Sequence, residues 1–160
     1  MSQRVVFEAA TPADADDIAQ VYLTSRKHFL PYARLVHSDE QVRQWIAEAL
    51  IPTSDIWVAR LDGRIVGMLA IRRDETAGWI DQLYLLPEAV GQGMGSEFIQ
   101  IAKTNLGPPI RLYTFQANPG ARRFYERHGF KAIAFSDGVQ NEEKCPDILY
   151  EWGDKKNPFS

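Results

Sequence analysis

The stretch "VGQGMG", residues 90–95, decides the fold prediction, because it places three glycines within five positions. An apolar run, "WIDQLYLL", precedes it and a helical pattern, "SEFIQIAKTNL", follows it. Glycine costs about 0.5–1 kcal/mol relative to alanine in ordered structure, so three together need a reason. One reason is a cradle whose backbone N–H groups face a pyrophosphate at a helix N-terminus. The other is a tight turn in which glycine only provides space.

Length, composition and charge limit the classes of protein that fit. The chain has 160 residues, of which 45% are hydrophobic and 24% charged, as in a soluble single-domain protein. A net charge of −3 does not favour nucleic acid as a partner. No apolar run approaches the roughly 20 residues of a membrane span, and the Asp-rich start is unlike a secretory signal. One cysteine, Cys145, allows no internal disulfide. We therefore expect a cytoplasmic protein with no membrane partner.

The order of the expected elements predicts a mixed α/β (α+β) sheet. Asp62-Gly63 between two β-branched runs predicts a hairpin with a tight type I′ turn. Ser38 and Gln41 predict the capping box of a helix. The complete order is strand 4–10, helix 12–28, a helix after residue 38, three strands over 55–86, helix 93–105, strand 110–115, helix 118–129, and two last strands. Strands cluster instead of alternating strictly with helices, which argues against a doubly wound sheet. Residues 1–153 form one domain in this prediction, and 154–160 are a loose tail.

Two other glycine-rich phosphate sites do not match the residues. A dinucleotide-binding fold requires G-x-G-x-x-G in its first βαβ unit, but Ser96 stands at the third glycine position and a meander precedes the motif. A P-loop requires a Gly-Lys pair, and the sequence has none. The three histidines are far apart in sequence, which indicates no metal site.

Two segments together resemble the GNAT superfamily of acyl-CoA-dependent N-acetyltransferases. They are "IDQLYLLPEAVGQGMGSEFIQIAK", residues 80–103, and "NPGARRFYERHGF", residues 118–130. The phosphate loop of that family reads Gln or Arg, two residues, Gly, one residue, then Gly or Ala. Its second signature is an asparagine followed seven residues later by a tyrosine. The resemblance implies a single N-acetyltransferase domain over 1–153 with a GNAT-like fold. That fold has a central mixed, mostly antiparallel sheet of about seven strands, flanked by four helices and splayed between strands 4 and 5.

The resemblance also implies which residues hold acetyl-CoA. Backbone groups of Leu83, Tyr84 and Leu85 would pair with the pantetheine arm and the acetyl carbonyl. The pyrophosphate would be held by the backbone amides of Gly91, Gln92, Gly93, Met94, Gly95 and Ser96. Asn118 would contact the cofactor near its thiol end. Val90 departs from the family, which prefers Gln or Arg there, so some side-chain support for the phosphates is lost.

Acetyl transfer to an amine needs a proton for the leaving thiolate and a base for the ammonium. By the resemblance, Tyr125 would donate the proton, and a phenol with a pKa of about 10 holds it at neutral pH. Strand alternation would place Trp79, Asp81, Leu83 and Leu85 on one face, where a partly desolvated Asp81 would be a good base. The alternatives are a water chain as the base, with Asp81 bonded to a loop or facing solvent.

The acceptor is expected to be a primary amine of a small molecule or peptide. Glu142 and Glu143 on the loop before the last strand would form an acidic rim for a cation, and His37 would line the acceptor site. We expect direct attack of the amine on the thioester, because no nucleophile with its base is apparent. Two other classes stay open: a non-catalytic acyl-CoA-binding sensor or regulatory module, and an interaction domain without cofactor. The resemblance also allows a homodimer.

Overall fold

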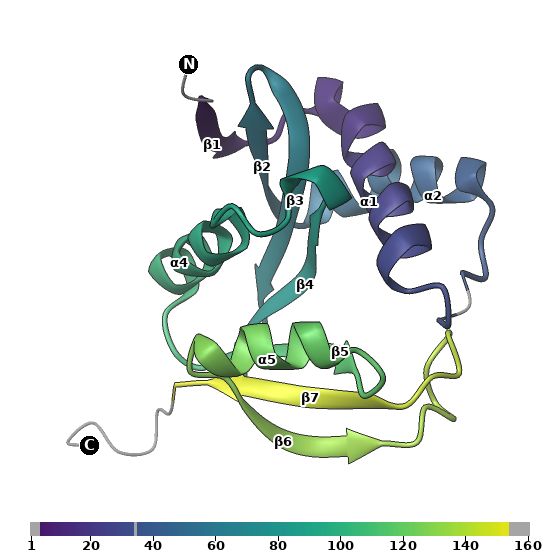
Figure 1. The fold of residues 1–160 in the computed structure, drawn as a ribbon, viewed down its shortest axis with the longest axis vertical. Coiled ribbons are helices and arrows are strands. Elements are labelled where there is room, and N and C mark those ends of the chain that lie inside the picture. The colour runs from purple at the N-terminus through teal and green to yellow at the C-terminus, as the bar shows by residue number, and fades with distance from the viewer. Residues whose placement is uncertain (1–3, 34, 154–160) are drawn as a thin grey trace.

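A seven-stranded mixed sheet forms the centre of the protein (Figure 1), in the order β1-β2-β3-β4-β5-β7-β6. The computed structural model describes residues 4–33 and 35–153, so the expected tail at 154–160 lies outside the described residues. Neighbouring strands are antiparallel except β4 and β5. This confirms the predicted mixed, mostly antiparallel sheet. The strands are β1 Val5–Ala9, β2 Asp55–Leu61, β3 Arg64–Arg73, β4 Gly78–Leu85, β5 Ile110–Phe115, β6 Lys131–Ser136 and β7 Asp147–Trp152.

The helices begin where the sequence provides caps. Ser38 and Gln41 form the predicted capping box, with the Ser38 N–H donating to Gln41 Oε1 at 2.8 Å and the Gln41 N–H donating to Ser38 Oγ at 3.1 Å. The helices are α1 Ala15–Phe29, α2 Asp39–Trp45, α3 Ile51–Thr53, α4 Met94–Leu106 and α5 Pro119–Arg127. A 3-10 turn, Pro12–Asp14, leads into α1, and a π-helical segment, Ile46–Leu50, joins α2 to α3. In the described part of the chain, no helix combines the length and apolarity needed to cross a bilayer.

The hairpin between β2 and β3 has the predicted turn. Asp62 and Gly63 both have positive φ, 53° and 87°, as a type I′ turn requires. The turn sets the pairing of Leu61 with Arg64 and brings the long, buried β3 beside β4. The local sequence therefore sets the pairing of β2 with β3 next to the turn, and bulges shift the register farther along both β2–β3 and β3–β4.

The sheet splays open between β4 and β5. These strands pair in parallel through two residue pairs in the described chain, Gly78 with Ile110 and Trp79 with Arg111. In Figure 1 the strands β2 to β4 run steeply, whereas β5, β7 and β6 run across the lower half of the molecule. The splay leaves the carboxyl-terminal half of β4 without a neighbour on its β5 side.

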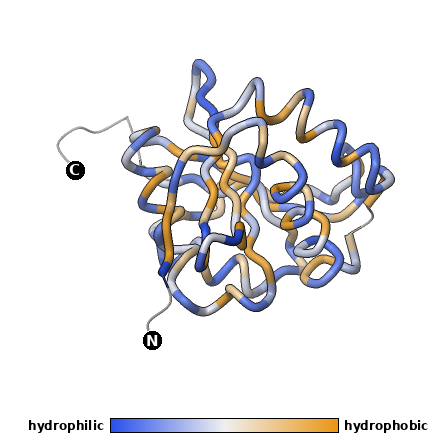
Figure 2. The backbone as a smooth tube through the Cα atoms, turned by 90° about the horizontal axis from the view of Figure 1, so that it is seen from above, coloured by the Kyte–Doolittle hydropathy of each residue, from blue (hydrophilic) through white to orange (hydrophobic). Residues whose placement is uncertain are grey.

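Helices cover both faces of the N-terminal half-sheet. On one face Tyr84 of β4 packs on Tyr22 of α1, with ring centroids 5.2 Å apart. On the other face Phe98 of α4 packs on Phe7 of β1 at 5.2 Å, and Leu85 lies in the same layer. Figure 2 shows hydrophobic and hydrophilic residues alternating along the helices, as expected for helices that pack one side on a sheet.

We expect replacement of Gly67 by alanine to destabilise the fold. A Cβ at Gly67 would lie 2.6 Å from Leu85 Cδ2 and 3.0 Å from Phe98 Cε2, so the Leu85 side chain and the buried Phe98 ring would have to move. The expected loss is about 1–3 kcal/mol of unfolding free energy, measured by urea denaturation. Gly120→Ala is the matched control, because the Cβ there would meet only Asn118 Oδ1 at 3.8 Å within a helix. That variant should be neutral or gain up to about 1 kcal/mol. Equal stability of both variants would contradict the packing described here.

Candidate functional site

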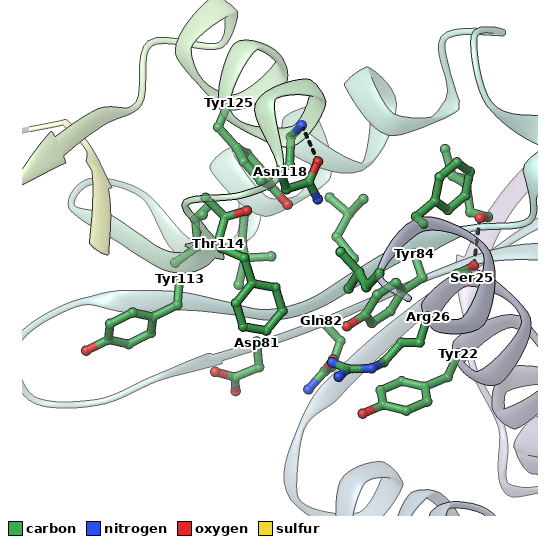
Figure 3. A pocket seen from close by; sticks show the side chains of 18 of the residues that line it. Tyr22, Ser25, Arg26, Asp81, Gln82, Tyr84, Tyr113, Thr114, Asn118 and Tyr125 are labelled. Carbon is green, nitrogen blue, oxygen red and sulfur yellow. Dashed lines mark hydrogen bonds between the residues drawn. The ribbon is translucent and has the colours of Figure 1, made fainter. Parts of the chain in front are cut away.

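A cavity of about 1290 Å³ opens at the splay (Figure 3). Its walls come from α1, α2, the carboxyl-terminal half of β4, the glycine stretch, β5, α5 and the loop between β6 and β7. Segments far apart in sequence therefore meet at one place, where the sheet ends its continuous pairing. Such a concave site with convergent polar groups is the natural place for a ligand.

The glycine stretch forms one wall of the cavity and precedes α4. Gly91 and Gly93 have φ of +83° and +85°, which L side chains rarely adopt, and Gly93 is the N-cap of the 13-residue helix α4. A Cβ at either position would meet no described atom within 4 Å, so the space in front of the backbone is open. Backbone N–H groups and the helix N-terminus then form a cradle suited to a phosphate. Val90, 49% exposed, lies at its edge and offers no charge.

The open edge of β4 supplies backbone groups for a second contact. Leu83 pairs with Leu69 of β3. On the side away from β3 the splay leaves the backbone of residues 83–85 unpaired with β5 in the described chain. At the strand end, Ser25 Oγ of α1 donates to the Leu85 carbonyl at 2.7 Å. An extended polar chain could add to this edge as a further strand would.

Asn118 and Tyr125 stand on α5 across the cavity from β4, as Figure 3 shows. Asn118 Oδ1 caps the helix by accepting from the Ala121 N–H at 3.1 Å, so its side-chain amide donors are left for other contacts. Tyr125 packs against the rings of Phe124 at 5.2 Å and Phe130 at 5.8 Å. Burial, and next the neighbouring Tyr84, raise the pKa of Tyr125 far above its ordinary value. Tyr125 therefore keeps its proton at any physiological pH.

The structure corrects the expected surroundings of Asp81. Ile71 pairs with Ile80 and the next β3 residue, Ala70, pairs with Gln82, so Asp81 is the extra residue of a β-bulge. The bulge breaks the alternation on which the expectation depended, and places Trp79 on the opposite face from Leu83 and Leu85.

Asp81 also forms an ion pair with Arg72 and is not isolated among apolar side chains. Arg72 Nε donates to Asp81 Oδ2 at 2.6 Å, and the Arg72 guanidinium lies 5.3 Å from the ring of Trp79. In Figure 3 Asp81 points to the opposite side of β4 from Tyr125. Asp81 still lines the cavity, but Arg72 occupies the carboxylate oxygen that the prediction left free to accept a proton.

A buried cluster of polar side chains on α1 was missed by the sequence analysis. Arg26 is 6% exposed, lies with its Cζ 5.8 Å from the ring of Tyr22, and lines the cavity beside Tyr84. Its Nη1 is 3.6 Å from Glu143 Oε2 on the loop between β6 and β7. A signal was available, because Ile18, Tyr22 and Arg26 follow one another at a spacing of four on the inner face of the helix.

The three residues expected near the acceptor meet at the mouth of the cavity. His37, between α1 and α2, hydrogen-bonds Glu142 through its Nε2 across the mouth. Glu143, the next residue, points inward to Arg26. The loop that carries both glutamates is tied internally by Asn141, whose Nδ2 donates to the Cys145 carbonyl at 2.7 Å. The His37–Glu142 hydrogen bond and the Arg26–Glu143 ion pair thus link the two halves of the molecule above the cavity.

The other candidate chemistries find little support. Burial, with Glu143 and Asp147 nearby, raises the pKa of the Cys145 thiol, which disfavours the nucleophilic thiolate. Across residues 4–33 and 35–153, no group of three His, Cys, Asp or Glu side chains gathers as a metal site would require. The cavity is therefore suited to bind a phosphate-bearing ligand and to supply a proton from Tyr125.

Comparison with known sequences gives one family. The sequence model described as "Acetyltransferase (GNAT) domain" matches residues 52–132. An N-acetyltransferase of Archaeoglobus fulgidus is 30% identical over 124 residues, which cover 70% of this chain and 83% of that protein. The peptidyl-lysine N-acetyltransferase YiaC of Escherichia coli is 24% identical over 107 residues, 67% of this chain and 69% of that protein. The N-acetylaspartate synthetase of Rattus norvegicus is 27% identical over 128 residues, but the match spans only 42% of its length.

Solved structures share the fold at low sequence identity. The PaiA N-acetyltransferase of Thermoplasma acidophilum, solved with coenzyme A, aligns with a TM-score of 0.72 and 20% identity over 96% of this chain and all of that one. An N-acetyltransferase structure from Rhodopseudomonas palustris aligns with a TM-score of 0.75 and 18% identity, over 96% of this chain and 98% of its own.

Acidification below about pH 6.5, the ordinary pKa of histidine, should destabilise the protein through His128. Its Nε2 lies 3.1 Å from Ser96 Oγ at the end of the glycine stretch, and burial, Lys103 and Arg127 lower its pKa. The unfolded chain then binds the proton more readily than the folded one, so unfolding free energy falls as the pH drops. Urea denaturation at pH 7.5 and 5.5 should show a larger loss for the wild type than for His128→Gln. An equal loss in both would contradict this role of His128.

Proposed function

The chain belongs to the GNAT family of acetyltransferases, and on that premise we propose that this N-acetyltransferase moves an acetyl group from acetyl-CoA to a primary amine by direct attack. The observation that carries the proposal is the position of Tyr125, which faces the open edge of β4 across the cavity. The glycine cradle lines the same cavity. These parts are what a thioester with a diphosphate would need: an anion cradle, an edge of free backbone and a proton donor.

The residues present fit acetyl-CoA. The open space before Gly91 and Gly93 and the N-terminus of α4 suit the pyrophosphate. The free edge of β4 suits the amide groups of a pantetheine arm, and Asn118 has amide donors left for the thiol end. Bound there, acetyl-CoA would supply an acyl carbon activated by its thiol leaving group. The lack of charge at Val90 predicts modest affinity for the phosphates.

The proposed reaction needs two proton transfers, one from the acceptor amine and one to the departing sulfur. The acceptor must lose a proton before attack, since an amine with a pKa of about 10.4 is mostly charged at neutral pH. Asp81 is paired with Arg72 and faces away from Tyr125, so a water chain through the cavity is the better route for that proton. Tyr125 holds its proton for the departing sulfur. Because burial stabilises the neutral phenol, the proton passes only when a thiolate forms beside it.

The acceptor enters between the glutamates and α1 in this proposal. Glu142 and His37 stand exposed at the mouth, where a carboxylate attracts a cationic amine. The names of the similar proteins point to two kinds of acceptor: a peptidyl lysine for the Escherichia coli protein, and aspartate for the rat N-acetylaspartate synthetase. Both carry a primary amine.

Acetyl-CoA should raise the melting temperature of the protein, whereas NADH and ATP should not. Ligand at a hundred times its Kd adds about 2.7 kcal/mol, which is several degrees for a domain of this size. Gly93→Ala is the matched variant, because alanine strains the backbone at φ +85° while its Cβ clashes with no other atom of the described chain. It should lower the shift. The absence of a shift at millimolar acetyl-CoA would sink the proposed function.

Tyr125→Phe should lower kcat about 10²- to 10⁴-fold, the range typical of general acid catalysis. The affinity for acetyl-CoA should stay within a few-fold, since the ring and its packing against Phe124 and Phe130 are kept. Release of the free thiol measures the rate. Tyr113→Phe, a 60% exposed tyrosine that also lines the cavity, is the control and should keep its rate. Unchanged turnover in Tyr125→Phe would remove the acid role.

A further inference from the structure

A buried arginine on the acceptor side of the cavity has more donors than partners. Arg26 Nε has no hydrogen-bond partner among the described residues, although the atom is buried. Its Nη1 lies 3.6 Å from Glu143 Oε2, which is longer than a hydrogen bond. A guanidinium has five N–H donors in a planar fork. Glu143 therefore balances the charge of Arg26, and the Tyr84 hydroxyl takes one hydrogen-bonding contact with its guanidinium. The buried Nε is still left without a partner in the described part of the chain.

Such an arrangement is costly unless an anion completes it. A guanidinium cannot escape by losing its proton, and a buried charge is tolerated when it is both paired and hydrogen-bonded. The ring of Tyr22, 5.8 Å from Arg26 Cζ, adds a cation–π contact but accepts no strong hydrogen bond. The group that matches the fork is a carboxylate, which takes two parallel N–H···O bonds.

The position of Arg26 fits a group on the acceptor. Tyr84 lies between Arg26 and Tyr125: its ring packs on Tyr22 beside Arg26, and on its other side it helps raise the pKa of Tyr125 after burial. Arg26 and Tyr125 both line the cavity, and Figure 3 shows Tyr84 in the region between them. A molecule with its amine near Tyr125 would need only a short carbon chain to place a carboxylate at Arg26.

We propose that Arg26 binds a carboxylate of the acceptor, so that the acceptor is a small amino acid and not a simple amine. This rests on the proposed function. Glu143 neutralises Arg26 in the free protein, and the carboxylate of the acceptor takes its place on binding. Arg26 is then the residue that sets specificity, while the amine is recognised elsewhere in the cavity.

The test compares acids with their amides. The acceptors are glycine, β-alanine, γ-aminobutyrate and L-aspartate, each beside its carboxamide, which keeps the amine and removes the negative charge. Acetylation is measured as kcat/KM. Binding of each compound is measured separately by calorimetry with coenzyme A present and no acetyl donor. The three unbranched acids vary the distance between amine and carboxylate by one methylene at a time.

Three variants separate specificity from structure. Arg26→Met keeps the length and apolar stem, and Arg43→Met, on α2 and outside the cavity, is the control. Glu143→Gln removes the competing carboxylate but keeps Arg26. In the wild type at least one acid should exceed its amide tenfold or more in kcat/KM. Arg26→Met should remove that preference by weakening the acid at least tenfold while leaving the amide unchanged. Glu143→Gln should tighten binding of the acid and not of the amide.

Equal use of acids and amides by the wild type would overturn the proposal. An equal loss for both in Arg26→Met would also overturn it, because that pattern means Arg26 only holds the loop between β6 and β7. Failure of the proposed function looks different: acetyl-CoA then produces no melting shift and no acceptor is acetylated, while calorimetry still reports whether acids bind through Arg26.

Discussion

The end of pairing between β4 and β5 is the constraint on which the rest of the site depends. Two residue pairs join the half-sheets, and beyond them the backbone of β4 has an edge that the described chain does not fill. The same divergence makes room for the cavity and brings α1, α4 and α5 to its walls. In a continuously paired sheet these backbone groups would be consumed, and no groove would lie between Tyr125 and Arg26.

Tyr125 and Arg26 differ in how burial affects their charge. Tyr125 is partly buried, and this burial raises its pKa, so the side chain stays neutral and able to donate a proton. Arg26 has no such response, since a guanidinium stays charged, and its compensation comes from Glu143 across the mouth. The cavity wall therefore carries a neutral proton donor, Tyr125, and a buried ion pair, Arg26 with Glu143. Ligand groups of different charge would find different partners along this wall.

Sequence patterns predicted what depends on neighbours in the chain. The Asp62-Gly63 turn and the Ser38 capping box each depend on residues within a few positions, and both are confirmed. The GNAT fold and family are confirmed too, because the glycine stretch and the second signature have fixed spacings. The prediction for the surroundings of Asp81 was wrong, because a bulge adds one residue to β4 and no local feature of the sequence marks it. The spacing on α1 could have placed Arg26 on the inner face, but its pairing with Glu143 could not be predicted, because the two residues are remote in the chain.

The charged contacts at the mouth also bear on how a turnover ends. His37 with Glu142 and Glu143 with Arg26 link the halves through polar contacts, beside the aromatic pair of Tyr32 and Phe115. Acetylation turns a cationic amine into a neutral amide, so the molecule leaving the cavity has one positive charge fewer than the molecule that entered. In the proposed function, the Glu142 carboxylate attracts the cationic acceptor and has no comparable attraction for the neutral amide of the product. The rim would then favour release of the product over its rebinding.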